Sequence, residues 1–582
     1  MRSRSTNRRF ARWALVLPAF ALVAAACGGD DDTTADEPPA VEDDGTESED
    51  SGSEPASGDG DDGGDGDDAT EDGSEASEPA GGDDEPADMA EDLTLTVGVV
   101  AEPLTLDPQH HRNRGTQIVS RKVHDNLVYL DPLSADRIYV WKLATGAEQV
   151  DDLTWDVFLR EGVEFHDGYP FNSESVLYTY ERLFDEELNS PRATMGSQSL
   201  ITEIEAIDDY TVRFHTSELI EANEQGFPIA LGLYSQEMLR PGIYDGVSLE
   251  EAATMPTVGT GPWKFVEWEQ GQYVRFERND DYWDGPPQPS ELVMRFIPES
   301  STLSAELITA SVDLIYPVDS DTMAGLAGQD GIEVTAAPGT SMTMLQVSVQ
   351  EGRQFADLDL RLGLNAAIDR NLIVDNLFQG FAVTETQMTP RPIEGDTDPA
   401  AGYDQDSEGY QYDPDLAREL LAPLAGETIE LHSATNNLLM AEVVAEQLRQ
   451  VGLDVEVIPE DPAAMSSAID SGEYDIWIQA YGGLEDIGNN WDTHFSCATN
   501  EAGIVRTGYC NPEQDARMEE ARGLDEEERE QVYSEIGKEL NANPPWVPLW
   551  TLNEIAAYRD YVSDFVLSPV GQLNLWNVKL NK

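Results

Sequence analysis

Residues 428–480 alternate between the two hydrophobic periodicities that distinguish strands from helices. Three short segments place apolar residues at every second position, as strands with one buried face do: 428–433, 453–458 and 474–480. Two segments with helical spacing separate them, 438–451 and 463–469. The order strand–helix–strand–helix–strand predicts a parallel α/β unit, so the fold class that we expect is α/β.

The end of the third predicted strand locates the candidate binding site. Ligands of parallel sheets bind beyond the carboxyl ends of the strands. The strand ends near Ala480, and we therefore expect the segment that begins at Tyr481 to carry the binding chemistry.

Other segments fit a large α/β body over residues 93–582. Residues 155–160 are typical of a strand, and Asp413 before Pro414 predicts the start of a helix. Residues 360–372 place apolar side chains, Leu372 included, on one predicted helical face. The body shows no repeat of 20–50 residues.

Charge separates the chain into three segments and excludes one class of partner. The 582 residues hold 34 Lys and Arg against 114 Asp and Glu, a net charge of −80. A nucleic-acid partner is excluded, because phosphate recognition needs a basic surface. Residues 28–92 contain 28 acids, no Lys or Arg and almost no apolar side chain. Residues 27–92 are therefore predicted to be a disordered acidic linker that starts at Cys27.

The first 26 residues have the pattern of an export signal peptide. Five arginines precede a 14-residue apolar stretch that is too short to cross a bilayer, and small residues lead to Cys27. The pattern favours cleavage before Cys27 and lipidation of that cysteine. Ordinary cleavage after Ala26, which leaves a free Cys27, is the alternative. Either way we expect an extracytoplasmic protein, anchored to the cell membrane if the lipid is present.

Motifs for catalysis and for metal binding are missing from the sequence. It contains no G-x-S-x-G, H-E-x-x-H, C-x-x-C or phosphate-binding P-loop pattern, so we expect no enzyme, no cofactor and no metal site. His110 and His111 are adjacent and bind a transition metal jointly only if they lie in a loop. The acids between Asp404 and Asp415 have a spacing similar to a calcium loop, with a solvated loop as the favoured interpretation.

Five groups of motifs in order resemble family 5 of the bacterial extracellular solute-binding proteins, the oligopeptide, dipeptide and nickel group of ABC importers. They are EPLTLDP at 102–108 with VHDNL at 123–127, LREGVEFHDG at 159–168 after Trp155, VGTGPWKF at 258–265 with Asn279, Tyr282 and Trp283, LNAAIDR at 364–370, and YDP at 412–414 with Ala417, Leu420 and Leu421. The resemblance covers essentially all of 94–582.

The resemblance implies a two-lobed periplasmic-binding-protein-like fold, type II with an extra subdomain, that closes around a ligand by a hinge. Lobe I would comprise 93–341 with a subdomain at about 130–257, and lobe II would comprise 342–545. Residues 546–582 would return to lobe I, with hinge crossings near 341 and 546.

The resemblance also points to ligand-binding residues after Tyr481. Peptide-binding members place an Asp four residues after a glycine, where it pairs with the α-ammonium of the peptide; here Asp486 occupies that position. The Trp that usually follows the glycine is replaced by Gly483, and Trp491 is the candidate for the aromatic wall. His110 is a further candidate ligand contact.

Cys497 and Cys510 follow this segment closely and are predicted to form a disulfide. In an exported protein, cysteines this near in sequence are more often bridged than free. Peptide-binding members of the family have a similar arrangement, which suggests that the bridge stiffens one wall of the binding cleft.

The function that we expect is a monomeric, lipid-anchored binding protein that delivers peptides or similar polar solutes to the permease and ATPase of an ABC importer. The alternatives left open are a nickel-chelate or sugar receptor of the same fold and a surface receptor for signalling or chaperoning.

Overall fold

The structure is a computed structural model of the whole chain. It describes residues 93–582 except 112, 131–138, 194–199, 218–235, 390–402, 404–406, 461–473, 482–493, 498–506, 522–523, 525 and 569–570. None of the helices in this described part combines the length and the apolar character that crossing a bilayer requires. The export signal, Cys27, the acidic linker and the Asp404–Asp406 end of the calcium-like loop lie outside the described residues.

A seven-stranded mixed sheet contains strands from both ends of the body. Its order is β12 (Ile332–Ala337), β19 (Glu554–Arg559), β11 (Leu314–Tyr316), β1 (Thr94–Val99), β10 (Glu291–Phe296), β9 (Tyr273–Arg278) and β8 (Trp263–Glu269). The central strand β1 pairs in parallel with β10 and β11, and the other neighbours are antiparallel. The apolar side chains of β1, Leu95, Val97 and Val99, lie at every second position, and all three are buried.

A six-stranded sheet contains the segment that first indicated the fold. Its order is β14 (Ala382–Thr384), β18 (Trp546–Leu552), β13 (Met342–Val347), β17 (Ile476–Tyr481), β15 (Thr428–Ala434) and β16 (Asp454–Glu460). The three predicted strands are confirmed as β15, β16 and β17, mutually parallel, with α10 (Leu438–Gln450) between the first two. The sheet as a whole is mixed, because β13 is antiparallel to both β17 and β18. The predicted helix at 463–469 lies outside the described residues.

A four-stranded antiparallel sheet forms a third core. Its order is β4 (Ala144–Asp151), β5 (Thr154–Leu159), β7 (Thr211–Thr216) and β6 (Ile201–Asp208), and α2 (Ser173–Leu183) packs on β6 and β7. The strand predicted at 155–160 is thus confirmed as β5.

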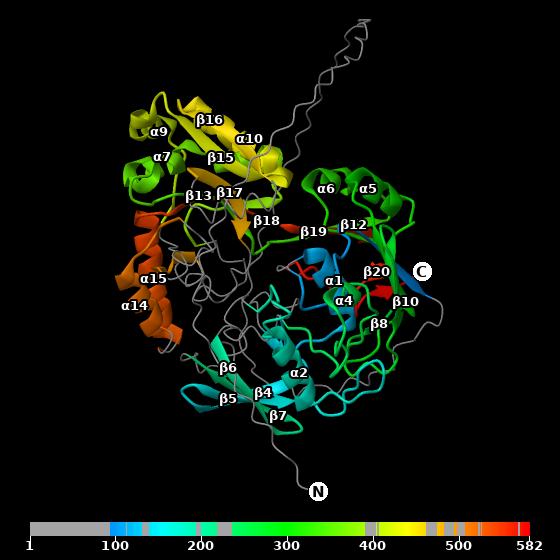
Figure 1. Cartoon of the computed structure of the whole chain (residues 1–582). Helices are drawn as coiled ribbons and strands as arrows, with labels where there is room; N and C mark the ends of the chain where they lie inside the picture. Colours follow the sequence, from blue (N-terminus) through cyan, green and yellow to red (C-terminus); the bar gives the residue numbers. More distant parts are fainter. Residues whose placement is uncertain are drawn as a thin grey trace, which may run out of the picture. The chain divides into compact units, whose positions relative to one another are not determined.

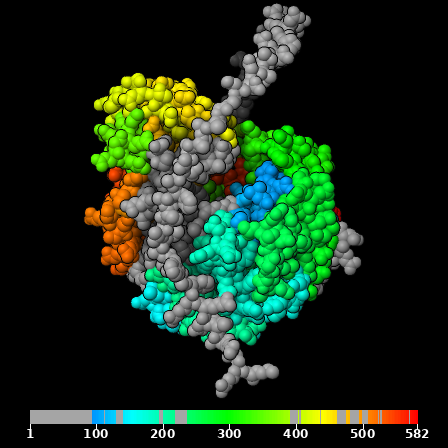
Figure 2. Space-filling model, in the orientation of Figure 1, coloured from blue at the N-terminus to red at the C-terminus, as the bar shows by residue number. Residues whose placement is uncertain are grey.

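Helices cover the two larger sheets (Figure 1). Next to the seven-stranded sheet are α1 (Arg114–Val123), α5 (Ser300–Ile308) and α6 (Ser320–Leu326). One face of the six-stranded sheet packs against α7 (Leu358–Ala367), α8 (Arg370–Leu377), α9 (Pro414–Leu420) and α10. Helices α14 (Pro512–Ala521) and α15 (Glu526–Ala542) share a second cluster with β13, and Figure 2 shows them at the surface in orange. The remaining short elements are α4 (Leu249–Ala252), β2 (Val128–Leu130), β3 (Tyr139–Trp141), β20 (Val562–Ser563), β21 (Lys579–Leu580), η3 (Gln354–Ala356), η4 (Ala422–Leu424) and η5 (Thr435–Asn437).

Two local predictions have different outcomes. The start of α9 is confirmed, because the Asp413 side chain accepts hydrogen bonds from two backbone N–H groups in the first turn. The prediction of a single helical face over residues 360–372 is wrong, because α7 ends at Ala367 and Asp369 caps a new helix, α8. The second helix starts in a different rotational phase, so Leu372 is 54% exposed.

The chain passes between the two large sheets twice. Residues 338–341 connect β12 to β13, and Asn553 connects β18 to β19. The second crossing follows Leu552 and not residue 545, because residues 546–552 pair with β13 and β14. Sequence reasoning placed it too early because the Trp- and Pro-containing segment of β18 has no strand periodicity: six of its seven positions are buried.

Candidate ligand-binding site

The carboxyl ends of three parallel strands meet at one edge of the six-stranded sheet. β15, β16 and β17 end at Ala434, Glu460 and Tyr481. Near this edge, His432 Nδ1 lies 3.1 Å from Glu460 Oε1, and its ring is stacked on Trp477 with the ring planes 6° apart. Both His432 and Trp477 are buried, so this pair packs the sheet next to the edge and does not itself form a surface for a solute.

The predicted ligand loop follows directly from this edge. Tyr481 is the last residue of β17, and its backbone pairs with Met342 of β13. Gly483, Asp486 and Trp491 lie outside the described residues, as does the side chain of Tyr481. Their roles in ligand binding stay predictions.

A disulfide joins Cys497 to Cys510, which follow that loop in the sequence. Between these cysteines and the sheet lies an aromatic cluster. The ring of Phe495 is 4.6 Å from that of Trp546 and 6.2 Å from that of Tyr509. Since Trp546 is the first residue of β18, these contacts attach the disulfide-bridged segment to a central strand.

The seven-stranded sheet presents a charged group at its own carboxyl edge. Arg114 is the first residue of α1, where Asn113 caps the helix, and Tyr316 is the last residue of β11. Arg114 Nη2 lies 2.6 Å from Glu554 Oε2, and the Tyr316 hydroxyl donates to the same oxygen at 2.8 Å. Glu554 opens β19, directly after the second crossing.

The residues around Arg114 stabilise its charged form and fix the orientation of its side chain. Burial opposes the charged form, but the electrostatic and hydrogen-bonding contacts with Tyr316 and Glu554 outweigh it and raise the pKa of Arg114. Burial also raises the pKa of Tyr316, so its hydroxyl keeps its proton. The Arg114 side chain is 45% exposed, and its hydrogen bonds with described residues all use Nη2. Nε and Nη1 point away from each other on the guanidinium group, so each can donate a single charge-assisted hydrogen bond to a carboxylate.

The histidine pair is divided between two environments. His110 is half-buried, whereas His111 is buried, with Nε2 3.1 Å from Arg192 Nη1 and Nδ1 accepting from the backbone of Asn113. Burial and the charge of Arg192 lower the pKa of His111 to about 4. Both ring nitrogens of His111 are therefore engaged within the protein, which argues against joint metal binding. Within the described ranges no group of three or more His, Cys, Asp or Glu could hold a metal ion.

Sequence reasoning did not find the Arg114 cluster. Its three members are separated by about two hundred residues each and meet only through the sheet order β19–β11–β1. The one available signal is the pattern of Asn113 before a helix, which places Arg114 in a first helical turn. Nothing in the sequence identifies Glu554 as its partner.

The sequence of this chain is similar to that of known solute-binding proteins. The sequence profile described as bacterial extracellular solute-binding proteins, family 5, middle region, matches residues 139–501. A glutathione-binding protein of Pectobacterium atrosepticum is 26% identical over 492 residues, covering 80% of this chain and 90% of that protein.

Solved structures share the fold. The oligopeptide-binding protein of Bacillus subtilis in complex with a nonapeptide has a TM-score of 0.70 at 21% identity, covering 84% of this chain and 99% of that one. A Campylobacter jejuni protein in complex with Ni(L-His) has a TM-score of 0.67 at 22% identity, covering 82% and 96%. The expected two-lobed, type II binding-protein fold is thereby confirmed.

Proposed function

This chain belongs to family 5 of the bacterial extracellular solute-binding proteins, and from that membership we propose that it captures a peptide-like solute for an ABC importer. The solute carries both an ammonium and a carboxylate group. The observation that carries this proposal is the half-exposed Arg114, fixed by Tyr316 and Glu554 at the carboxyl edge of the seven-stranded sheet. The protein performs no covalent chemistry: it binds, closes and hands the solute to a membrane permease.

Closure by a hinge is supported by the two chain crossings. Lobe I then comprises 93–337, with the subdomain at about 130–257, together with the return that begins at Glu554. Lobe II comprises 342–552. Residues 338–341 and Asn553 are the hinge, because they are the short connections between strands of different sheets. A ligand that contacts both lobes favours the closed state by its differential affinity for that state.

The two charged ends of the solute have separate partners in this proposal. Asp486, in the loop after β17, pairs with the ammonium group, as the family resemblance implies. Arg114 offers Nη1 or Nε to the carboxylate for a single charge-assisted hydrogen bond. Trp491 and Tyr481 supply apolar walls, Gly483 leaves room beside them, and His110 contributes a further polar contact.

The finer statements about location also belong to this proposal. Lipidation of Cys27 and an extended acidic linker at 28–92 would hold a monomeric binding protein within reach of its permease at the membrane. The family itself is extracytoplasmic.

The first test identifies the solute and the ammonium contact. Mass spectrometry of the ligand that co-purifies with the protein names the solute class, and calorimetry with that solute measures affinity. Asp486→Asn should weaken binding by about 2–5 kcal/mol, because the cation of the solute stays buried and unpaired. The neighbouring change Glu485→Gln removes the same charge from the same loop and should leave affinity nearly unchanged. Equal losses in both variants would reject the assignment of Asp486.

The second test isolates the carboxylate contact at Arg114. The wild-type protein should bind a peptide with a free carboxyl terminus more tightly than the same peptide amidated there. Arg114→Gln should abolish that preference, whereas Arg418→Gln, which removes a half-exposed arginine of α9, should preserve it. An unchanged preference in Arg114→Gln would show that another residue holds the carboxylate. A co-purified metal chelate or sugar would replace the peptide proposal by the corresponding alternative.

A further inference from the structure

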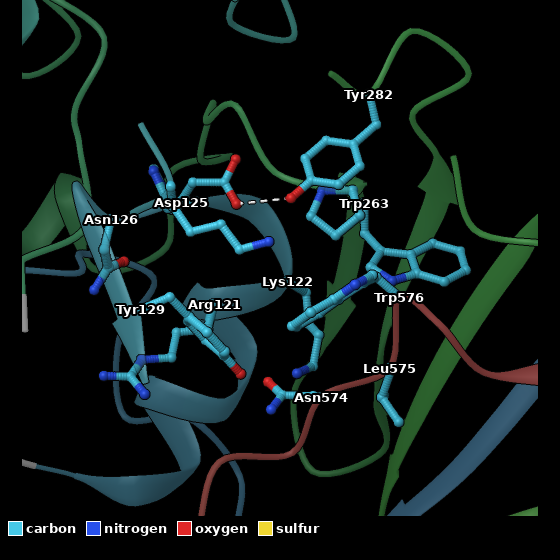
Figure 3. Close-up of a pocket in the computed structure, with 13 residues that line it drawn as sticks. Arg121, Lys122, Asp125, Asn126, Tyr129, Trp263, Tyr282, Asn574, Leu575 and Trp576 are labelled. Atoms are coloured by element: carbon cyan, nitrogen blue, oxygen red, sulfur yellow. Dashed lines mark hydrogen bonds between the residues drawn. The ribbon is translucent and has the colours of Figure 1, made fainter. Parts of the chain in front are cut away.

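A small, partly open cavity lies within the lobe of the seven-stranded sheet, at the end of α1. Its volume is about 30 Å³, roughly twice the 10–15 Å³ that one water needs. Its walls come from the last turn of α1, from the start of β8 and from residues 574–576 near the C-terminus. Figure 3 shows the side chains of Lys122 and Asn574 pointing toward each other in this cavity. It is separate from the carboxyl edge described above.

Nitrogen donors of three residues in the cavity wall have no hydrogen-bond partner among the described residues. Within the part of the chain that the structure describes, Arg121 Nη1, Trp263 Nε1 and Asn574 Nδ2 are buried and make no hydrogen bond. Trp263 is completely buried, so its N–H cannot reach solvent instead. A buried donor without a partner costs about 1–3 kcal/mol relative to a satisfied one. Three of them around one cavity indicate an acceptor that the protein itself does not supply.

Lys122 adds an uncompensated positive charge to the same wall. Its side chain is 3% exposed, and Nζ donates to the backbone carbonyl of Leu573. It forms no ion pair with any described residue. Burial, and to a lesser extent the charge of Arg121, lower its pKa to about 7.

The nearby charges are already engaged elsewhere. Arg121 lies 3.6 Å from Glu237, which Arg192 also contacts at 3.2 Å. Lys142 pairs with Asp284.

Asp125 lines the opposite side of the cavity, and its carboxylate is held by other groups. It accepts hydrogen bonds from Thr260, Tyr282 and Trp283, each at 3.0 Å, and Figure 3 shows the bond to Tyr282. The cluster around the cavity therefore has one cation, Lys122, without a carboxylate.

We propose that this cavity is a binding site for a single monovalent anion of the size of chloride, held by Lys122, Arg121, Trp263 and Asn574. A halide ion accepts hydrogen bonds from every direction and supplies the missing negative charge. A water molecule can accept from these donors, but it brings no negative charge to offset that of Lys122. The ion links α1, which carries Arg114, to β8 and to the C-terminal segment.

The test compares stability in sodium chloride and in sodium gluconate at equal ionic strength. Gluconate screens surface charges equally but is too large for a cavity of 30 Å³. At a chloride concentration 100 times the dissociation constant, the folding equilibrium shifts about 100-fold toward the folded protein. We therefore expect a higher urea midpoint in chloride. Equal midpoints in the two salts would overturn the proposal.

Two further measurements assign the effect to the cavity. Lys122→Met should lose the chloride-dependent shift, whereas Lys538→Met, at an exposed position of α15, should keep it. A full shift in Lys122→Met would overturn the proposal. Crystals of the wild-type protein soaked in sodium bromide require no variant: an anomalous peak between Lys122 and Asn574 supports the site, and bromide found only at the surface rejects it.

Discussion

A methyl group at Gly259 tests whether the 258–265 motif is structural. A Cβ built at this position lies 2.1 Å from the carbonyl oxygen of Val123 and 2.7 Å from its carbonyl carbon. Both are backbone atoms at the last residue of α1, so no side-chain rotation relieves the contact. The turn that contains Gly259 must move away from the helix.

The cost of that movement follows from two local contacts. Forced displacement in a packed site costs about 1–3 kcal/mol. The same Val123 carbonyl accepts a hydrogen bond from Gly261 N at 2.8 Å, and leaving this helix-terminal group unpaired costs about 1–3 kcal/mol more. We therefore expect Gly259→Ala to lower the free energy of unfolding by about 2–6 kcal/mol.

Urea unfolding followed by tryptophan fluorescence measures this loss. The matched control is Gly325→Ala in α6, where a Cβ meets no atom within 4 Å. This control should gain about 0.5–1 kcal/mol, because alanine is the better helix former. A Gly259→Ala protein as stable as the wild type would refute the steric reasoning. The motif would then no longer be assigned a structural role, and a role in ligand contact would have to be considered.

Three further predictions concern the termini, the pH response and the disulfide. Cys27→Ala should move the protein from the membrane fraction to the soluble fraction, and unchanged detergent partitioning would exclude lipid anchorage. Burial lowers the pKa of His494 to about 3, so the folded protein keeps this histidine neutral. The unfolding free energy is therefore greatest above pH 6.5 and falls as the pH drops toward 3, by up to about 1.4 kcal/mol per pH unit. His494→Gln should flatten the measured dependence of unfolding free energy on pH in that window, and an unaltered slope would contradict the pKa. Replacing Cys497 and Cys510 by Ser should cost about 3 kcal/mol, because the bridge closes a loop with a sequence separation of 13; a reductant should reproduce the loss in the wild type but leave the double variant unaffected.

Local sequence patterns were sufficient for the elements whose periodicity is set by one buried face. β15, α10, β16 and β17 follow from alternation and helical spacing, and the start of α9 follows from Asp413 before a proline. These signals involve neighbouring residues only, so they do not depend on which strands meet. The family resemblance added the two-lobed fold, which periodicity alone could not distinguish from other α/β arrangements.

Strands buried on both faces gave weaker signals. β18 is buried at six of seven positions, and its register with β13 and β14 places the second crossing at Asn553. The break between α7 and α8 depends on Asp369, whose side chain accepts from Leu372 N and starts a helix in a new phase. A polar capping residue can end one helix and start another without changing the spacing of the hydrophobic residues, so the spacing does not reveal the break.

Charged and polar groups that act together were determined only by the tertiary structure. Arg114, Tyr316 and Glu554 belong to a helix, an internal strand and the C-terminal return, and the sheet order brings them together. Likewise, Lys122 becomes an unpaired buried cation only because β8 and the C-terminal segment close over the end of α1. Local patterns in the sequence located the strands and helices named above, and the ordered motifs identified the family. Burial and pairing of charge depend on distances between residues hundreds of positions apart, and only the packed sheets decide those distances.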